Sequence, residues 1–171
     1  SMSKINYTHN FPKSGRELTA DITYASGSGS NGSYISNYYY APDGSPSSDP
    51  NFVRNSGGNT NDQLTIQADF VNPLTENAKL EVGVRSFTQS TGNVFNAYSV
   101  NNNAEIKLPL STNVRYDETV HAAYTTYTDK WRGIKYQLGL RAEYSKFDGE
   151  LVDSVQHFGY ELPADIGQLL K

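Results

Sequence analysis

Apolar and polar residues alternate with a period of two along several stretches of the chain. In the first clear example, residues 18–24, the even positions are apolar and the odd positions between them are polar. Side chains on a strand point alternately to opposite faces, so each such stretch predicts a strand with one apolar and one polar face. The pattern is found in residues 18–24, 64–70, 80–85, 119–124 and 136–145.

The composition agrees with a β-rich chain and excludes several other classes. The 171 residues include 13 Tyr and 14 Gly, and this length suits one domain or a piece of a larger one. No stretch approaches the ~18 consecutive apolar residues of a spanning helix, which excludes a helical membrane protein. Without cysteine there is no disulfide framework and no thiolate metal site. The net charge of −4 argues against a nucleic-acid partner.

We expect an all-β fold, an antiparallel up-and-down meander of about six strands. The strands are expected at residues 4–11, 17–38, 62–72, 78–99, 114–128 and 134–150. Residues 1–3 resemble a vector scar, 4–158 form the three hairpins, and 159–171 form a loop or a short helical tail with Pro163 in its first turn.

The connections between these strands alternate in length. Residues 12–16, 72–77 and 129–133 are short and rich in turn formers, as hairpins require. The connections at 39–61 and 100–113 are long. Short turns on one edge and long loops on the other are typical of outer-membrane barrels. A soluble Greek-key domain with the same loop lengths by chance remains the alternative.

Pairing the predicted strands assigns their faces. In the first hairpin we place Phe11 opposite Leu18, and in the last we place Ala123 opposite Gly139. The second pairing sets Val120, Ala122 and Tyr124 on the apolar face, together with Glu118, which conflicts with a lipid contact. The polar face suits a wet lumen. Its predicted lumen-facing residues are Asp21, Asp69, Arg85, His121, Arg141 and Glu143.

Aromatic residues close several of the apolar runs. Tyr24, Phe70, Tyr124 and Tyr136 stand at run ends, where aromatic rings would meet a lipid–water boundary. The ordinary preference of tyrosine for strands is the alternative explanation. Their shared position favours an aromatic girdle.

Two consecutive strand motifs carry a family resemblance. Residues 113–124 read NVRYDETVHAAY and residues 134–144 read IKYQLGLRAEY. They resemble the Y-x-E-x-x-x-A-A-Y strand and the following G-L-R-x-E strand of TonB-dependent receptor-like outer-membrane β-barrel proteins. Residues 7–24 and 80–85 resemble the preceding strands in their usual order. The resemblance implies an internal fragment of a transmembrane β-barrel.

The resemblance also implies a function and partners. The parent would be a TonB-dependent receptor for nutrient uptake in the cell outer membrane of a Gram-negative bacterium. Its partners would be outer-membrane lipid, the rest of the barrel with its plug, and TonB. An isolated fragment would self-associate or curl to bury its apolar face.

Ligand contact is expected from the long loops, above all from Tyr34, Tyr38, Tyr39 and Tyr40. The three histidines are far apart in the sequence and no nucleophile motif is present, so we expect no catalytic residues, no metal and no cofactor. The alternative function is a soluble secreted or surface β-domain that binds carbohydrate through its tyrosine-rich loops.

Overall fold

The computed structural model describes residues 1–101, 104–152 and 156–170, with side chains as far as Val152. Its strands are β1 (Met2–Asn10), β2 (Glu17–Tyr40), β3 (Pro46–Pro73), β4 (Lys79–Asn101), β5 (Ala104–Lys107), β6 (Thr112–Trp131), β7 (Ile134–Leu151) and β8 (Gln156–Leu170). They form one sheet in the order β1-β2-β3-β4-β6-β7-β8, and the short β5 pairs with β4. Every pairing is antiparallel, which confirms the predicted meander. Among these residues, no helix has the length and apolar character needed to cross a membrane.

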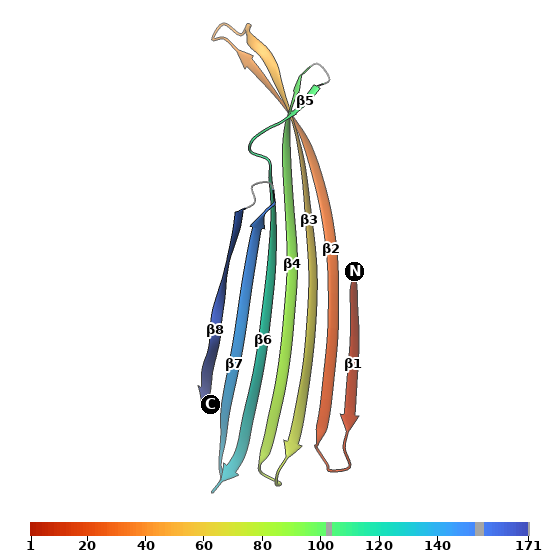
Figure 1. Ribbon diagram of the computed structural model, residues 1–171, viewed down its shortest axis with the longest axis vertical. Helices are drawn as coiled ribbons and strands as arrows, with labels where there is room; N and C mark the ends of the chain where they lie inside the picture. Colours follow the sequence, from red (N-terminus) through yellow and green to blue (C-terminus); the bar gives the residue numbers. More distant parts are fainter. Residues whose placement is uncertain (102–103, 153–155, 171) are drawn as a thin grey trace.

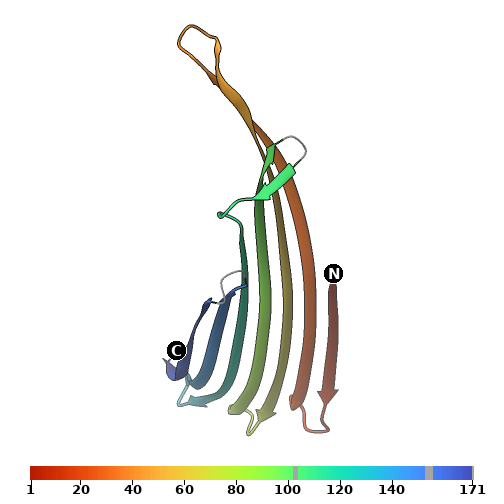
Figure 2. The same ribbon diagram turned by 45° about the horizontal axis from the view of Figure 1, so that its top comes forward.

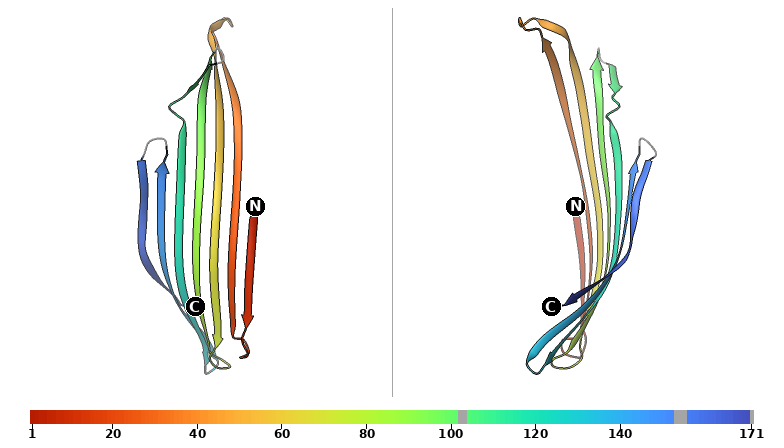
Figure 3. Two further views of the ribbon diagram at one scale, coloured as in Figure 1. Left: turned by 45° about the vertical axis from the view of Figure 1, so that its right-hand side comes forward. Right: turned by 90° about the vertical axis from the view of Figure 1, so that its left-hand side faces the viewer.

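The sheet is a tall, curved strip with two open edges, β1 and β8 (Figures 1 and 2). The turns after β1, β3 and β6 gather at one end, and the β2–β3 hairpin extends furthest at the other (Figure 1). Seen from the side, the strip bends along its length (Figure 3). The expected segregation of short turns from long excursions is therefore present, and we call these the turn end and the hairpin end.

The long connection expected at 39–61 is mostly strand. Backbone pairing between β2 and β3 continues from Glu17 opposite Val71 up to Tyr40 opposite Pro46, with register shifts near Tyr39. This leaves a short turn in which Asp43 accepts hydrogen bonds from the backbone N (2.9 Å) and Oγ (2.6 Å) of Ser45. Composition predicted a loop, but glycine, serine and asparagine pair through their backbones once the ladder below them is formed.

Two further expectations need correction. Within 100–113, residues 104–107 form β5, which pairs with residues 98–101 of β4. The tail expected at 159–171 as loop or helix is instead covered by β8, apart from Lys171, which lies outside the described residues. Pro163 does not begin a helix; the β7–β8 register shifts between Glu143 and Ser145, opposite this region. Because proline cannot donate to a ladder, such an irregularity is where a strand accommodates it.

The observed registers differ from both predicted hairpins. In the first, His9 rather than Phe11 lies opposite Leu18. This slip of two residues leaves each side chain on its predicted face. In the last hairpin Ala123 lies opposite Ala142 rather than Gly139. A slip of three residues reverses the face of every residue on β6.

The turn between β6 and β7 causes this reversal. The strands run to Trp131 and Ile134, which are paired, so only Arg132 and Gly133 form the turn. Both have positive φ, 51° and 87°, which is the conformation of a two-residue type I′ hairpin. The predicted five-residue turn at 129–133 is therefore wrong, and the hairpin is centred further along the chain.

The sheet has little interior of its own. Among hydrophobic residues of the described part, only Ala78, Ala97 and Ala122 are buried, while Val84 and Leu140 are about half exposed. A single sheet layer cannot cover an apolar face by itself. The strip therefore needs an apolar environment against its apolar face. The polar face is where we look for a functional site.

Candidate functional site: the polar wall

The polar face carries the odd-numbered residues of β2, β3, β4 and β7 and the even-numbered residues of β1 and β6. One row across it joins Thr19, Asp69, Gly83, Tyr124 and Arg141. The next row toward the hairpin end joins Asp21, Gln67, Arg85, Ala122 and Glu143. The structure thus brings five of the predicted polar residues (Asp21, Asp69, Arg85, Arg141 and Glu143) into two adjacent rows.

These two rows and those nearer the turn end form the charged part of the wall. Gln67 Nε2 donates to Asp69 Oδ2 at 2.7 Å, and Asp21 accepts from the amide of Asn6. The Arg141 guanidinium lies 2.5 Å from Glu143 Oε2 on the same strand. Arg85 is exposed and, within the described residues, its side chain makes no hydrogen bond or ion pair. An exposed guanidinium of this kind is available to a carboxylate from outside the sheet.

Tyr124 closes the space above Gly83 in the first of these rows. The tyrosine ring lies over the glycine, and its hydroxyl donates to Asp69 on the strand beyond. A Cβ on Gly83 would overlap the ring. Tyr124 was expected in an aromatic girdle on the apolar face; the β6 register places it on the polar face instead.

Toward the hairpin end, the polar wall becomes neutral. Asn61 Oδ1 accepts hydrogen bonds from Gln89 Nε2 and Thr91 Oγ1, each at 3.0 Å. The rings of Tyr116 and Phe147 lie 5.7 Å apart beside this network. Apart from Glu118, which lies opposite Gln89, amides replace the carboxylates and guanidinium groups at this height.

A shallow groove lies above the amide network. Its polar-face lining consists of Gly29, Asn31, Gly57, Asn59, Asn93, Phe95, Thr112 and Val114, and its volume is about 480 Å³. The amides of Asn31 and Asn59 lie over the glycines that face them across β2 and β3, since a Cβ on either glycine would overlap them. Sequence reasoning missed these residues, because the asparagine–glycine pairs are visible only once the register is known.

The tyrosines expected in ligand-binding loops lie on the β2 extension. Tyr34 is 79% exposed and faces Arg54 on β3, while Tyr38 makes an edge contact with Phe52 at 6.4 Å between ring centroids. Tyr39 and Tyr40 are also exposed, at the register shifts near the tip. They do not converge with the groove on the polar wall.

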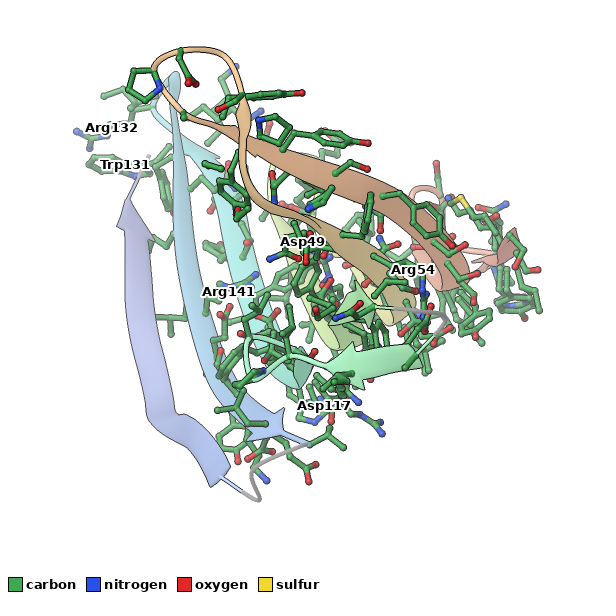
Figure 4. All side chains as sticks on the ribbon, turned by 90° about the horizontal axis from the view of Figure 1, so that it is seen from above. Asp49, Arg54, Asp117, Trp131, Arg132 and Arg141 are labelled. Atoms are coloured by element: carbon green, nitrogen blue, oxygen red, sulfur yellow. The ribbon has the colours of Figure 1, made fainter. Side chains whose placement is uncertain are left out.

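Arg54, on β3 in the extended part of the β2–β3 hairpin, binds Glu105 on β5. Its Nε and Nη2 lie 2.7 and 2.5 Å from the two carboxylate oxygens of Glu105, and its guanidinium lies 4.4 Å from the centre of the Tyr98 ring. The hydrogen bond from Arg54 lowers the pKa of the Glu105 carboxyl and raises the pKa of the guanidinium. Figure 4 shows Arg54 at the hairpin end, viewed from above.

His121 does not lie on the polar face as predicted. It pairs with Ser86 and Tyr144, and its ring stacks on Tyr144 at 6.3 Å with an interplanar angle of 8°. The three-residue change of register moves it to the apolar face. The same change moves Glu118 to the polar face, which removes the conflict noted from the sequence.

Aromatic residues do gather near the turn end of the apolar face. Tyr127 and Tyr136 both donate to Asp129 Oδ2, at 3.0 and 3.1 Å. Beyond them, Trp131 is exposed with the Arg132 guanidinium 4.7 Å from its ring centre (Figure 4). Of the predicted girdle residues, Tyr24, Phe70 and Tyr136 share this face. No three His, Cys, Asp or Glu side chains in the described part of the chain converge as metal ligands.

Comparison with known proteins identifies the family to which this sheet belongs. The family model of the outer membrane protein beta-barrel family matches residues 9–162. The chain belongs to this family. A solved structure of the ferric citrate transporter FecA in the unliganded form superposes with a TM-score of 0.60 at 12% identity, covering 99% of this chain and 23% of FecA. A search of curated proteins finds no similar sequence.

Membership of the outer membrane protein beta-barrel family indicates the environment of each face of the sheet and the cellular location of the protein. The strip is part of a transmembrane β-barrel in the outer membrane of a Gram-negative bacterium, and its apolar face meets lipid. On β4 the apolar rows run from Leu80 to Thr88, roughly 20 Å of height for a strand tilted by about 40°, close to the ~25 Å band of such barrels. The polar wall lines the lumen. A soluble secreted domain, the alternative from the sequence, is excluded.

Proposed function

We propose that this segment is a wall of a TonB-dependent receptor that takes up a nutrient across the outer membrane. The chain spans about a quarter of the FecA chain, with which it shares its fold. The remaining strands of the barrel would pair with the open edges of β1 and β8, which otherwise present unpaired backbone groups. The role is one of binding and transport, with no catalytic step.

The observation that carries this proposal is the charged lower part of the lumen wall. Arg85 projects into the lumen without a partner in the described residues, beside the ion pair of Arg141 and Glu143. A barrel that only conducts small solutes could leave such groups in water. A plug domain inside the barrel would present complementary charges to them, and a gated receptor needs such a plug.

The plug is tested by cross-linking in the complete protein. The sequence contains no cysteine, so Arg85→Cys provides a single reactive site in this segment. We expect a short bifunctional reagent to link it to a segment outside the barrel wall, identified by mass spectrometry. Thr88→Cys on the same strand faces lipid and serves as the control.

Energy coupling is tested by uptake in cells. We expect uptake of the cognate nutrient to be lost when either the receptor gene or TonB is deleted, and to be restored by the respective gene. Uptake that continues without TonB would refute the proposal, as would the absence of any internal segment linked to residue 85.

A further inference from the structure

Charge is distributed unequally between the two faces of the sheet near its hairpin end. The relevant height begins at the row of Gln63, Gln89 and Glu118 and ends at the row of Asn31, Gly57 and Phe95. In these rows of the lumen wall, from β2 to β7, Glu118 is the one charged side chain among the described residues. The outward face at the same height carries Asp62, Arg115, Asp117, Asp148 and Glu150, with Lys146 in the row just below.

Most of the charged side chains on the outward face form ion pairs with each other. Arg115 Nε lies 3.1 Å from Asp117 Oδ2, and Lys146 Nζ lies 3.0 Å from Asp148 Oδ2. The charged groups at this level therefore belong to the surface beside the lipid headgroups. They do not contribute to a ligand site in the lumen.

The neutral lumen wall offers a specific set of hydrogen-bonding groups. Asn31, Asn59 and Asn93 line the groove of about 480 Å³, within the roughly 300–1,000 Å³ range of small-molecule sites. Each amide supplies both a donor and an acceptor, as a ligand rich in hydroxyl groups requires. Since Asn31 and Asn59 lie over facing glycines, their amides form a low floor beside the exposed ring of Phe95.

Aromatic rings complete the surface below the groove. Tyr116 and Phe147 lie on the same wall, in the two rows beneath it. Rings that present an apolar face next to amides suit the alternating C–H faces and hydroxyl edges of a sugar ring. An anionic chelate would instead need arginine or lysine here, and the wall at this height has neither among the residues that the structure describes.

We propose that the groove formed by Asn31, Asn59, Asn93 and Phe95 is a binding site for an uncharged, hydroxyl-rich ligand of the oligosaccharide class. This inference rests on the proposed uptake function and names the class of its cargo. The groove lies on the hairpin side of the charged wall. A ligand entering from that side meets it before it meets the rows of Asp69 and Arg85.

Binding is measured by calorimetry on the complete, detergent-solubilised protein. The probes are maltohexaose, xylohexaose and mannohexaose, with ferric citrate as the anionic probe. We expect at least one hexasaccharide to bind more tightly than ferric citrate. Asn59→Ala and Asn93→Ala should each weaken that binding about threefold to tenfold, the effect of losing one hydrogen bond.

A matched control separates the groove from general destabilisation. Asn96→Ala lies on the same strand as Asn93 but on the outward face, and should leave the affinity unchanged. Asn93→Arg replaces an amide with a cation in the groove and should weaken hexasaccharide binding. Circular dichroism confirms that each variant retains its strands.

The outcomes discriminate between this inference and the proposed function. Preferential binding of ferric citrate by the unmodified protein overturns the neutral-ligand inference and leaves uptake intact. Hexasaccharide binding that is insensitive to Asn59 and Asn93 overturns the site, and failure of all three hexasaccharides overturns the class. If hexasaccharide binding depends on these residues but uptake does not require TonB, the binding site in the groove is supported and the proposed TonB-dependent uptake is refuted.

Discussion

The hydroxyl of Tyr124 on β6 donates a hydrogen bond to Asp69 on β3, across the intervening strand β4. This contact is possible because the residue between them is Gly83, which pairs with both. The ring covers the glycine, so three strands are joined by one side chain. Glycine destabilises a strand interior because it has no side chain to pack. A neighbouring aromatic ring that covers the glycine offsets this loss.

We predict that Gly83→Ala destabilises the barrel by about 1–3 kcal/mol, the usual cost of forcing extra atoms into an occupied space. The free energy of unfolding is measured in urea with the protein in lipid vesicles. In the double variant with Tyr124→Ala, the ring is gone and only the flexible Asp69 carboxylate still borders the added methyl group, so the two effects should not add. Gly27→Ala is the control, because a Cβ there meets nothing within 4 Å. Additive effects at residues 83 and 124 would contradict the interlock.

The register of the last hairpin gives a second prediction. Single cysteines at 121, 123 and 125, labelled with an environment-sensitive fluorophore, should be quenched from the lipid phase, whereas those at 122, 124 and 126 should not. The register expected from the sequence predicts the opposite phase on β6. Leu140→Cys and Arg141→Cys on β7 are the controls, since both registers place residue 140 in lipid and 141 in the lumen. Quenching at the even positions of β6 would refute the observed register.

The contrast between β7 and β6 shows what alternation can determine. On β7, Leu138 and Leu140 alternate with Gly139 and Arg141, so the face with larger apolar side chains is evident. On β6, Ala, Thr and Tyr occur in both phases, and hydropathy does not distinguish them. The turn then sets the phase, and the positive φ values of Arg132 and Gly133 fix it.

The hairpin end was the least predictable part of the fold. Residues 28–33 and 55–61 are rich in Gly, Ser and Asn, which are uncommon in strands. Composition predicted a loop at 39–61, while residues 28–33 were expected within the strand at 17–38. The ladder continues through both segments because the register of β2 and β3 is already set nearer the turn end. Extending it from there requires only backbone hydrogen bonds. Gly29, Asn31, Gly57 and Asn59 of the groove lie in these two segments, so their composition indicated neither the full length of the hairpin nor the groove.

The Arg54–Glu105 ion pair predicts a pH-dependent attachment of β5. Hydrogen bonding from Arg54 lowers the pKa of Glu105, so the stabilisation is complete above about pH 4.5, the ordinary value, and is lost as the pH falls through the lowered value. Hydrogen exchange should show protection of β5 amides near pH 6 that decreases by about pH 3. Glu105→Gln should show the low protection at both pH values. Wild-type protection that is unchanged by acid would refute the role of this pair.

The β6–β7 turn predicts a purely conformational cost. At Gly133, φ is 87°, and a Cβ there would meet nothing within 4 Å, so substitution strains the backbone without creating a steric clash. Gly133→Ala should therefore lower the free energy of unfolding by about 1–2 kcal/mol, the penalty of left-handed geometry for an L-residue. Arg132→Asn should have the opposite sign, because asparagine tolerates positive φ, although this variant also removes the cation–π interaction of Arg132 with the Trp131 ring. Gly27→Ala, with equal space but an extended backbone, should show no such loss, and equal effects at residues 27 and 133 would mean that the turn conformation does not limit stability.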